Sequence, residues 1–262
     1  MLSTRHSAVA GLFYPESPEP LRRELDDLLA ASDPAPAGPA PKALIVPHAG
    51  YVYSGPVAAR AYRRLEPVRG AIRRVVLLGP AHRVWLDGMA VPPQSAFATP
   101  LGQVPLDREA IERIADMPGV QVSDAAHAKE HSLEVQLPFL QTVLDDFALV
   151  PIAVGRCPAE QVGAVIDALW GGPETLIVVS SDLSHFLDYE EAREIDGRTR
   201  DKILGRRADL CDQEACGARA INGLMCSTAA RTLSIEAVDL RNSGDTAGDR
   251  KRVVGYGSFV LS

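Results

Sequence analysis

Three short apolar runs in this chain are each followed directly by a polar segment that contains a histidine. The runs cover residues 43–46, 75–78 and 176–179, and the histidines that follow them are His48, His82 and His185. Continuous apolar runs are typical of parallel strands buried on both faces, and ligands bind beyond the carboxyl ends of such strands. A single histidine there is most often a hydrogen-bonding residue, but the repeated arrangement predicts that three imidazoles converge on one pocket.

Segments with apolar residues at helical spacing alternate with these runs. The first helix is expected to begin at Ser17 and Pro18, with leucines at helical spacing over residues 21–29. Further helices are expected at 57–65, 107–116, 159–170, 189–204 and 218–233, and another begins at His131. The second apolar run belongs to a strand expected at 74–78, and one additional strand is expected at 148–154. This alternation predicts βαβ units and a parallel sheet.

The final part of the chain has a different pattern. Residues 237–240 and 253–261 predict strands, and a loop rich in turn-forming residues at 242–249 returns the chain antiparallel to the sheet edge. Residues 97–106 contain prolines and a glycine and fit an irregular hairpin. The sequence therefore predicts one α/β domain over residues 1–262, layered α/β/α, with a central mostly parallel sheet and antiparallel C-terminal strands.

Composition and charge exclude several classes of function. The chain has 262 residues and a formal net charge of −7, and it has no cluster of lysine and arginine, so we expect no nucleic-acid partner. No apolar stretch approaches the ~20 residues that span a bilayer, and the N-terminus lacks the apolar region of a signal peptide. We therefore expect no membrane association and a cytoplasmic location. The four cysteines have no disulfide-scaffold spacing.

The polar motifs taken together resemble those of the Memo family, whose prokaryotic members are labelled AmmeMemoRadiSam system protein B. The resemblance covers nearly the whole chain. In chain order the motifs are Gly11-Leu12-Phe13-Tyr14-Pro15, Pro47-His48-Ala49-Gly50-Tyr51, Leu78-Gly79-Pro80-Ala81-His82, Glu130-His131-Ser132-Leu133-Glu134, Ser180-Ser181-Asp182-Leu183-Ser184-His185, Cys216-Gly217 and Ser243-Gly244-Asp245.

The resemblance implies a fold similar to the class III, LigB-type extradiol dioxygenases, which use non-haem iron. It also implies that His48, His82 and Cys216 bind one transition metal ion, with Cys226 as the alternative cysteine. Two imidazoles and one thiolate suit Fe(II) or Cu best, and Zn is the alternative. A metal with these three ligands would have an open coordination position for water, dioxygen or substrate.

Five further residues are expected at the site. The resemblance implies that His185 transfers a substrate proton and that Asp182 fixes its tautomer, whereas an Asp182 that caps the next helix is the alternative. His131 and Glu134 are expected to share a helix face and line the pocket, unless Glu134 caps the helix start. Tyr51 is a further candidate for the lining, although aromatic packing explains it equally well.

One more residue bears on the ligand. Arg83 departs from the animal members of the family, which have a second histidine there, and makes the rim more cationic. A cationic rim favours an anionic or carboxylate-bearing ligand.

The leading functional hypothesis is a metal-dependent oxidoreductase acting on an unknown small molecule or peptide. A zinc-type metallohydrolase and a non-catalytic module that binds a peptide or protein in the same cleft are the alternatives. The resemblance also implies a functional link to a radical S-adenosylmethionine protein and an AMMECR1-like protein. The chain itself contains no cysteine-rich cluster motif.

Overall fold

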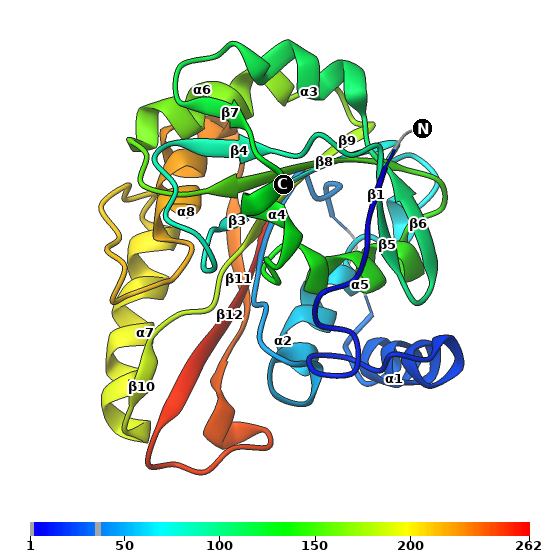
Figure 1. The fold of residues 1–262 in the computed structure, drawn as a ribbon. Helices are drawn as coiled ribbons and strands as arrows, with labels where there is room; N and C mark the ends of the chain where they lie inside the picture. Colours follow the sequence, from blue (N-terminus) through cyan, green and yellow to red (C-terminus); the bar gives the residue numbers. More distant parts are fainter. Residues whose placement is uncertain (1–2, 35–37) are drawn as a thin grey trace.

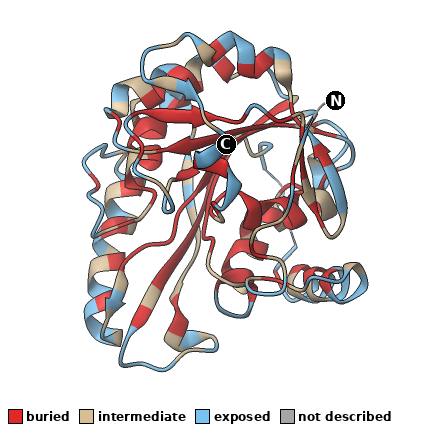
Figure 2. Cartoon of the chain, viewed as in Figure 1, coloured by how far each residue is buried: buried red, intermediate tan, exposed pale blue. Residues whose placement is uncertain are grey.

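Four parallel strands form the centre of the main sheet. The computed structural model describes residues 3–34 and 38–262. The strands β2 (Ala43–Val46), β9 (Thr175–Ser180), β3 (Arg74–Pro80) and β8 (Ala148–Val154) lie in this order and run in one direction (Figure 1). Nearly every residue in them is buried, as Figure 2 shows, because helices cover both faces of the sheet.

Further strands extend this sheet on both sides. Beyond β8, β4 (Met89–Val91) pairs antiparallel with it, and β7 (Val120–Val122) pairs parallel with β4. On the other side, β12 (Val253–Leu261) is antiparallel to β2 and also pairs with β10 (His185–Leu187) and β11 (Ile235–Asn242). A separate small sheet consists of β1 (Thr4–Arg5), β5 (Ala96–Thr99) and β6 (Gly102–Pro105).

Helices form the outer layers. One face of the sheet is covered by α6, α7 and α8, and the other by α1, α2 and α5 (Figure 1). The bounds are α1 Pro18–Ala30, α2 Tyr51–Arg63, α3 Arg108–Ala115, α4 Asp124–Ala128, α5 Leu137–Val143, α6 Ala159–Leu169, α7 Tyr189–Leu204 and α8 Ala218–Cys226. Short 3₁₀ turns occupy Glu66–Val68, Glu134–Gln136, Ala229–Thr232 and Ser243–Asp245. No helix in the described ranges is both long and apolar enough to cross a membrane.

The predicted α/β/α layering with a mostly parallel sheet is confirmed, and so are the antiparallel C-terminal strands. The hairpin of β5 and β6 and the helix capped by Asp107 are also as predicted, since the Asp107 carboxylate accepts the N–H of Ala110. Strands β4, β7 and β10 and helix α4 were not predicted. Each has five residues or fewer, which is too short for a periodic pattern to show.

Three predicted helix bounds are wrong. Helix α2 begins at Tyr51 and contains Pro56, because the packing of its apolar face offsets the one backbone hydrogen bond that proline removes. The helix predicted from His131 begins only with the 3₁₀ turn at Glu134, so His131 lies in a loop. Helix α8 ends at Cys226, where the Asp167 carboxylate accepts three hydrogen bonds from residues 227–229 and turns the chain.

Candidate metal centre

Three imidazoles meet at the carboxyl edge of the parallel strands. His48 follows β2, His82 follows β3, and His131 lies in the loop between α4 and the 3₁₀ turn at Glu134–Gln136. Each offers a ring nitrogen, and these three nitrogens all lie within 4.8 Å of one another. The ring centroids of His82 and His131 are 4.7 Å apart and nearly stacked, whereas the His48 ring stands edge-on to both.

The hydrogen bonds of Ser180 assign the tautomer of His48. The Ser180 hydroxyl donates to the carbonyl oxygen of Ser132 at 2.6 Å, and its oxygen accepts from Gln136 Nε2 at 2.8 Å. The contact of 2.8 Å between Ser180 Oγ and His48 Nδ1 therefore has the imidazole as donor. His48 Nε2 then keeps its lone pair and is the nitrogen available to a metal.

The carboxylate of Glu130 orients His82 in the same way. Its Oε1 accepts from His82 Nδ1 at 2.9 Å, which leaves the lone pair on His82 Nε2. The same oxygen accepts the N–H groups of His131 and Ser132, and Oε2 accepts the N–H of His82 at 2.5 Å. Burial alone raises the pKa of Glu130, but the hydrogen bonds and charge of His82 and the backbone N–H groups outweigh it and hold this pKa at about 2.

His131 is the least constrained of the three imidazoles. Its Nδ1 lies 3.3 Å from Glu130 Oε1, outside hydrogen-bonding geometry, and is buried with no hydrogen-bond partner among the described residues. The ring packs against Phe13 at a centroid distance of 4.8 Å. Transition metals bind nitrogen atoms that have an available lone pair. The buried, unpartnered nitrogen of His131, next to the imidazoles of His48 and His82, therefore fits a metal site.

The thiol of Cys216 adjoins this group. Its Sγ lies 3.3 Å from His48 Nε2 and 3.6 Å from the carbonyl oxygen of Asp182. Burial raises the pKa of this thiol, so in the metal-free protein it donates to the His48 lone pair. Cys226, the alternative cysteine, lies at the end of α8 beside Gly163 of α6, where these two helices pack.

The imidazoles of His48 and His131 have the protonation state that metal binding needs. Burial, followed by the charge of His82, lowers the pKa of His48 well below its ordinary value. Burial, followed by the charge of His48, lowers the pKa of His131 to about 4. Both rings are therefore neutral at pH 7, and a neutral imidazole is the form that binds a metal ion.

Asp182 and His185 lie at the same edge but do not form the expected pair. Asp182 Oδ1 accepts the backbone N–H of His48 at 2.7 Å, and burial raises the pKa of this carboxyl. His185 Nδ1 donates to the carbonyl oxygen of Leu183 at 2.8 Å, so a backbone carbonyl fixes the tautomer of His185 and Asp182 does not. A strand, β10, follows Asp182, so the alternative of a helix cap is also wrong.

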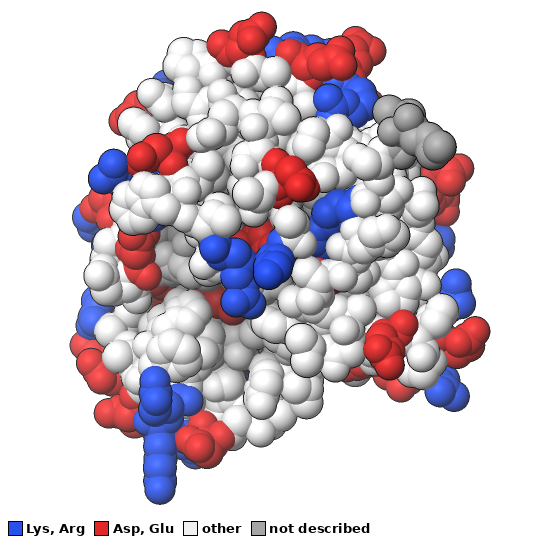
Figure 3. Space-filling view, viewed as in Figure 1, with Lys and Arg blue, Asp and Glu red and all other residues white. Residues whose placement is uncertain are grey.

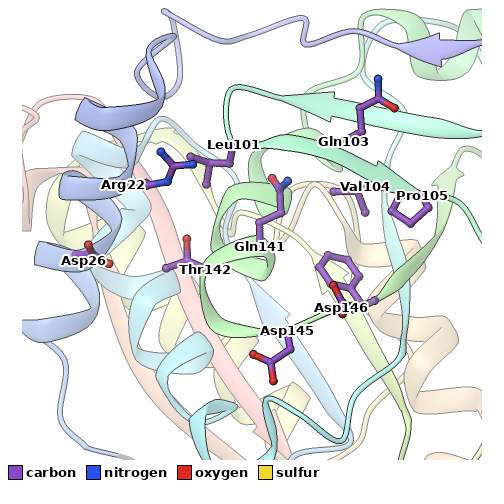
Figure 4. A pocket seen from close by; sticks show the side chains of 11 residues that line it. Arg22, Asp26, Leu101, Gln103, Val104, Pro105, Gln141, Thr142, Asp145 and Asp146 are labelled. Atoms are coloured by element: carbon purple, nitrogen blue, oxygen red, sulfur yellow. The ribbon is translucent and has the colours of Figure 1, made fainter.

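A cleft of about 480 Å³ opens beside the imidazoles. It shares His131 with the cluster, and its lining includes Asp182 and His185. The remaining lining residues are Phe13, Ala49, Gly50, Tyr53, Ser243, Gly248, Asp249, Arg252, Val254 and Tyr256. Another pocket, of about 400 Å³, lies between α1, the β5–β6 hairpin and α5 and contains no histidine or cysteine (Figure 4). The cleft beside His131 is therefore the candidate site.

Three residues expected in the lining lie elsewhere. The Tyr51 hydroxyl is buried and donates to the carbonyl oxygen of Val135 at 2.7 Å. Glu134 is fully buried and binds the N-terminal segment, where its partners are Arg5, the N–H groups of Ala8 and Val9, and the Tyr14 hydroxyl. Arg83 is exposed and does not line the cleft. The expectations that Tyr51, Glu134 and Arg83 line this cleft are thus corrected.

Other contributors were not predicted. Glu130 directly precedes His131 in the sequence, and a carboxylate next to a candidate metal-binding histidine was the signal that could have revealed it. Ser180, Gln136 and Arg252 gave no such signal. Their roles depend on contacts between segments far apart in the chain.

The fold and the imidazole cluster together define an α/β protein with a candidate metal centre at the carboxyl edge of its sheet. The family model described as "Memo-like protein" matches residues 5–260, and the chain belongs to this family. A MEMO1 family protein of Aquifex aeolicus is 38% identical over 277 residues, which cover 99% of this chain and 100% of that protein. A MEMO1 family protein of Archaeoglobus fulgidus is 35% identical, covering 98% of this chain and 99% of that one.

A solved structure shares the fold. It is the crystal structure of the uncharacterized protein JW3007 from Escherichia coli K12, with a TM-score of 0.52 and 15% sequence identity. The match covers 84% of this chain and 99% of that one. At this identity the similarity concerns the layered α/β architecture alone.

Proposed function

We propose that this protein is a metal-dependent oxidoreductase, related to the class III extradiol dioxygenases, whose substrate binds in the cleft beside His131. The main support is the convergence of the imidazoles of His48, His82 and His131, two of which donate through Nδ1 and therefore have an unprotonated Nε2. Such outer contacts are typical of metal-binding histidines.

These residues fit one transition metal ion. His48 and His82 would hold it with either His131 or the thiolate of Cys216, and the donor set suits Fe(II) or Cu. When bound, such an ion would supply one-electron chemistry and an open position for dioxygen or substrate. The hydrogen bonds of Ser180 and Glu130 keep the rings of His48 and His82 in place without any metal.

His185 would act as the proton acceptor in the cleft. Because its Nδ1 donates to the Leu183 carbonyl oxygen, its Nε2 has a free lone pair. The ring lines the cleft together with Asp182 and His131. A base at this position can accept a proton from a substrate hydroxyl or amine and return it later. Phe13 and Tyr256 in the same lining would exclude water from the substrate.

Metal content and dioxygen use test the proposal. Protein purified without added metal would be loaded anaerobically with Fe(II) or Cu, and bound metal measured by elemental analysis after dialysis. We expect Ala variants of His48 and His82 to lose metal, and Cys226→Ala, the matched cysteine control, to keep it. The loaded wild type should consume dioxygen or change its metal oxidation state by electron paramagnetic resonance. Full metal retention in both histidine variants would contradict the site.

A zinc-type metallohydrolase is the second candidate, and His131 is the observation that favours it. Three imidazoles with an open fourth position form a ligand set of zinc enzymes that activate water. If the zinc form alone hydrolyses ester or amide probes while the iron and copper forms neither hydrolyse them nor consume dioxygen, this candidate replaces the first.

A further inference from the structure

We propose that the cleft binds a small organic carboxylate, with Arg252 as the residue that recognises the carboxylate and with an apolar body packed toward Phe13 and His131. This inference rests on the proposed function, because it takes the same cleft as the substrate site. It concerns the class of ligand and not the reaction that the metal supports.

Arg252 lines the cleft and has a free guanidinium. Within the described ranges, its side chain makes no ion pair and no hydrogen bond, and only its backbone N–H contacts Asp249, at 3.4 Å. The Asp249 carboxylate also accepts the N–H of Lys251 at 2.8 Å, so it is held in its own turn. A planar guanidinium with five unused donors in a cleft is suited to bidentate binding of a carboxylate.

The Arg252 guanidinium packs on the ring of Phe186, a residue with an unusual backbone conformation. Phe186 has a φ of +61°, and it lies at the irregularity in the pairing of β10 with β12, between His185 and Leu187. A bulge at this point redirects side chains, and left-handed conformations of non-glycine residues concentrate at ligand sites. The ring is 60% exposed, and the Arg252 guanidinium packs over it at 4.8 Å.

This arrangement places the cation next to the proposed base. The rings of Phe186 and His185 are adjacent, with centroids 5.7 Å apart. A carboxylate held by Arg252 would therefore lie on the His185 side of the cleft. The rest of the lining is partly apolar and aromatic, with Phe13 packed on His131 and with Tyr53 and Val254. A ligand that matches this lining has an anionic end and an apolar body.

The charges of the lining favour a carboxylate over a phosphate. Besides Arg252, the lining contains the carboxyl groups of Asp182 and Asp249. A monoanion matches the single guanidinium, whereas the second charge of a dianion has no matching cation in the lining and increases the repulsion from these two groups. The formal net charge is −7, and acidic and basic side chains are interspersed on the face shown in Figure 3, so attraction of an anion must come from Arg252 locally.

The experiment measures binding of benzoate, benzamide and phenyl phosphate by calorimetry and saturation-transfer NMR. Metal-free and zinc-loaded protein would both be used, because neither form is redox-active and binding is then measured separately from the proposed reaction. We expect benzoate to bind, and benzamide to bind at least about 10-fold more weakly, because it lacks the charge. Arg252→Gln should weaken benzoate by about 10- to 100-fold, and Arg252→Lys by less.

Arg250→Gln is the matched control, because Arg250 is two residues away, lies outside the lining and packs over Tyr189 at 4.3 Å. Wild-type benzoate binding in Arg252→Gln, an equal loss in Arg250→Gln, tighter binding of phenyl phosphate, or no benzoate binding at all would each overturn the inference. Benzoate binding that depends on Arg252 in a protein without dioxygen chemistry would instead refute the proposed function alone.

Discussion

Glu130→Gln tests whether one buried carboxylate fixes the imidazole of His82 and the backbone at His131. Oε1 accepts from His82 Nδ1 and from the N–H groups of His131 and Ser132, each at 2.9 Å, and Oε2 accepts the N–H of His82 at 2.5 Å. Glutamine has the same size but only one oxygen and one NH₂ group. Whichever way the amide is turned, at least one of these four donors faces another donor.

The structure sets the expected magnitude. The better orientation keeps the amide oxygen at the Oε1 position and leaves only the N–H of His82 opposite the NH₂ group. One unsatisfied buried donor costs about 1–3 kcal/mol, and the free energy of unfolding should fall by that amount. A neutral amide also supports the His82 ring more weakly than a carboxylate, and such a change lowers metal affinity by about 10- to 100-fold.

Zinc titration calorimetry and urea unfolding are the two assays. Glu134→Gln is the control, since Glu134 is equally buried and accepts as many hydrogen bonds, all from residues 5–14. We expect the control to lose at least as much stability, because Glu134 also pairs with the buried Arg5, and to bind zinc as the wild type does. Wild-type zinc affinity in Glu130→Gln, or the same loss of affinity in Glu134→Gln, would refute the reasoning.

Two further predictions concern stability. Burial raises the pKa of Asp196 to about 6 from 3.8, so the carboxyl favours its neutral form in the folded state and stability should fall as pH rises between these values. Asp196→Asn should remove this decline, up to about 3 kcal/mol, in urea unfolding at pH 4 and pH 7, and an unchanged decline would contradict the assignment. Gly217→Ala would place a Cβ 2.6 Å from Ser181 Cβ and 2.8 Å from the Ser180 carbonyl oxygen. We expect a loss of about 1–3 kcal/mol by thermal denaturation, and an unchanged midpoint would show that α8 shifts freely.

The apolar pattern predicted the central sheet well because both faces of its strands are buried. Four consecutive apolar residues, as in Ala43–Val46, leave little alternative to a buried strand once a polar segment ends the run. The same logic placed His48 and His82 beyond strand ends, and the structure brings their rings to a centroid distance of 5.2 Å. His185 also follows its strand, yet it belongs to the cleft and not to the imidazole group.

Predictions that relied on helical spacing around His131 were wrong for a physical reason. Spacing of three residues implies a shared face only if the backbone is helical, and the segment before Glu134 is a loop. In that loop the backbone N–H groups of His131 and Ser132 turn back to the Glu130 carboxylate. The side chains of His131 and Glu134 therefore point to different places, one to the imidazoles and the other to the N-terminal segment.

The third ligand decides between the two proposed chemistries. Cys216 must lose a proton to bind a metal, and burial opposes that loss by raising the pKa of the thiol, whereas the neutral His131 ring can bind without losing one. A thiolate beside His48 and His82 would favour a redox-active iron or copper centre, and a third imidazole would equally suit zinc. Because Sγ lies 3.3 Å from His48 Nε2, an ion that binds this nitrogen must displace the thiol hydrogen bond. Cys216 then either becomes a ligand or turns to the Asp182 carbonyl oxygen, its other neighbour.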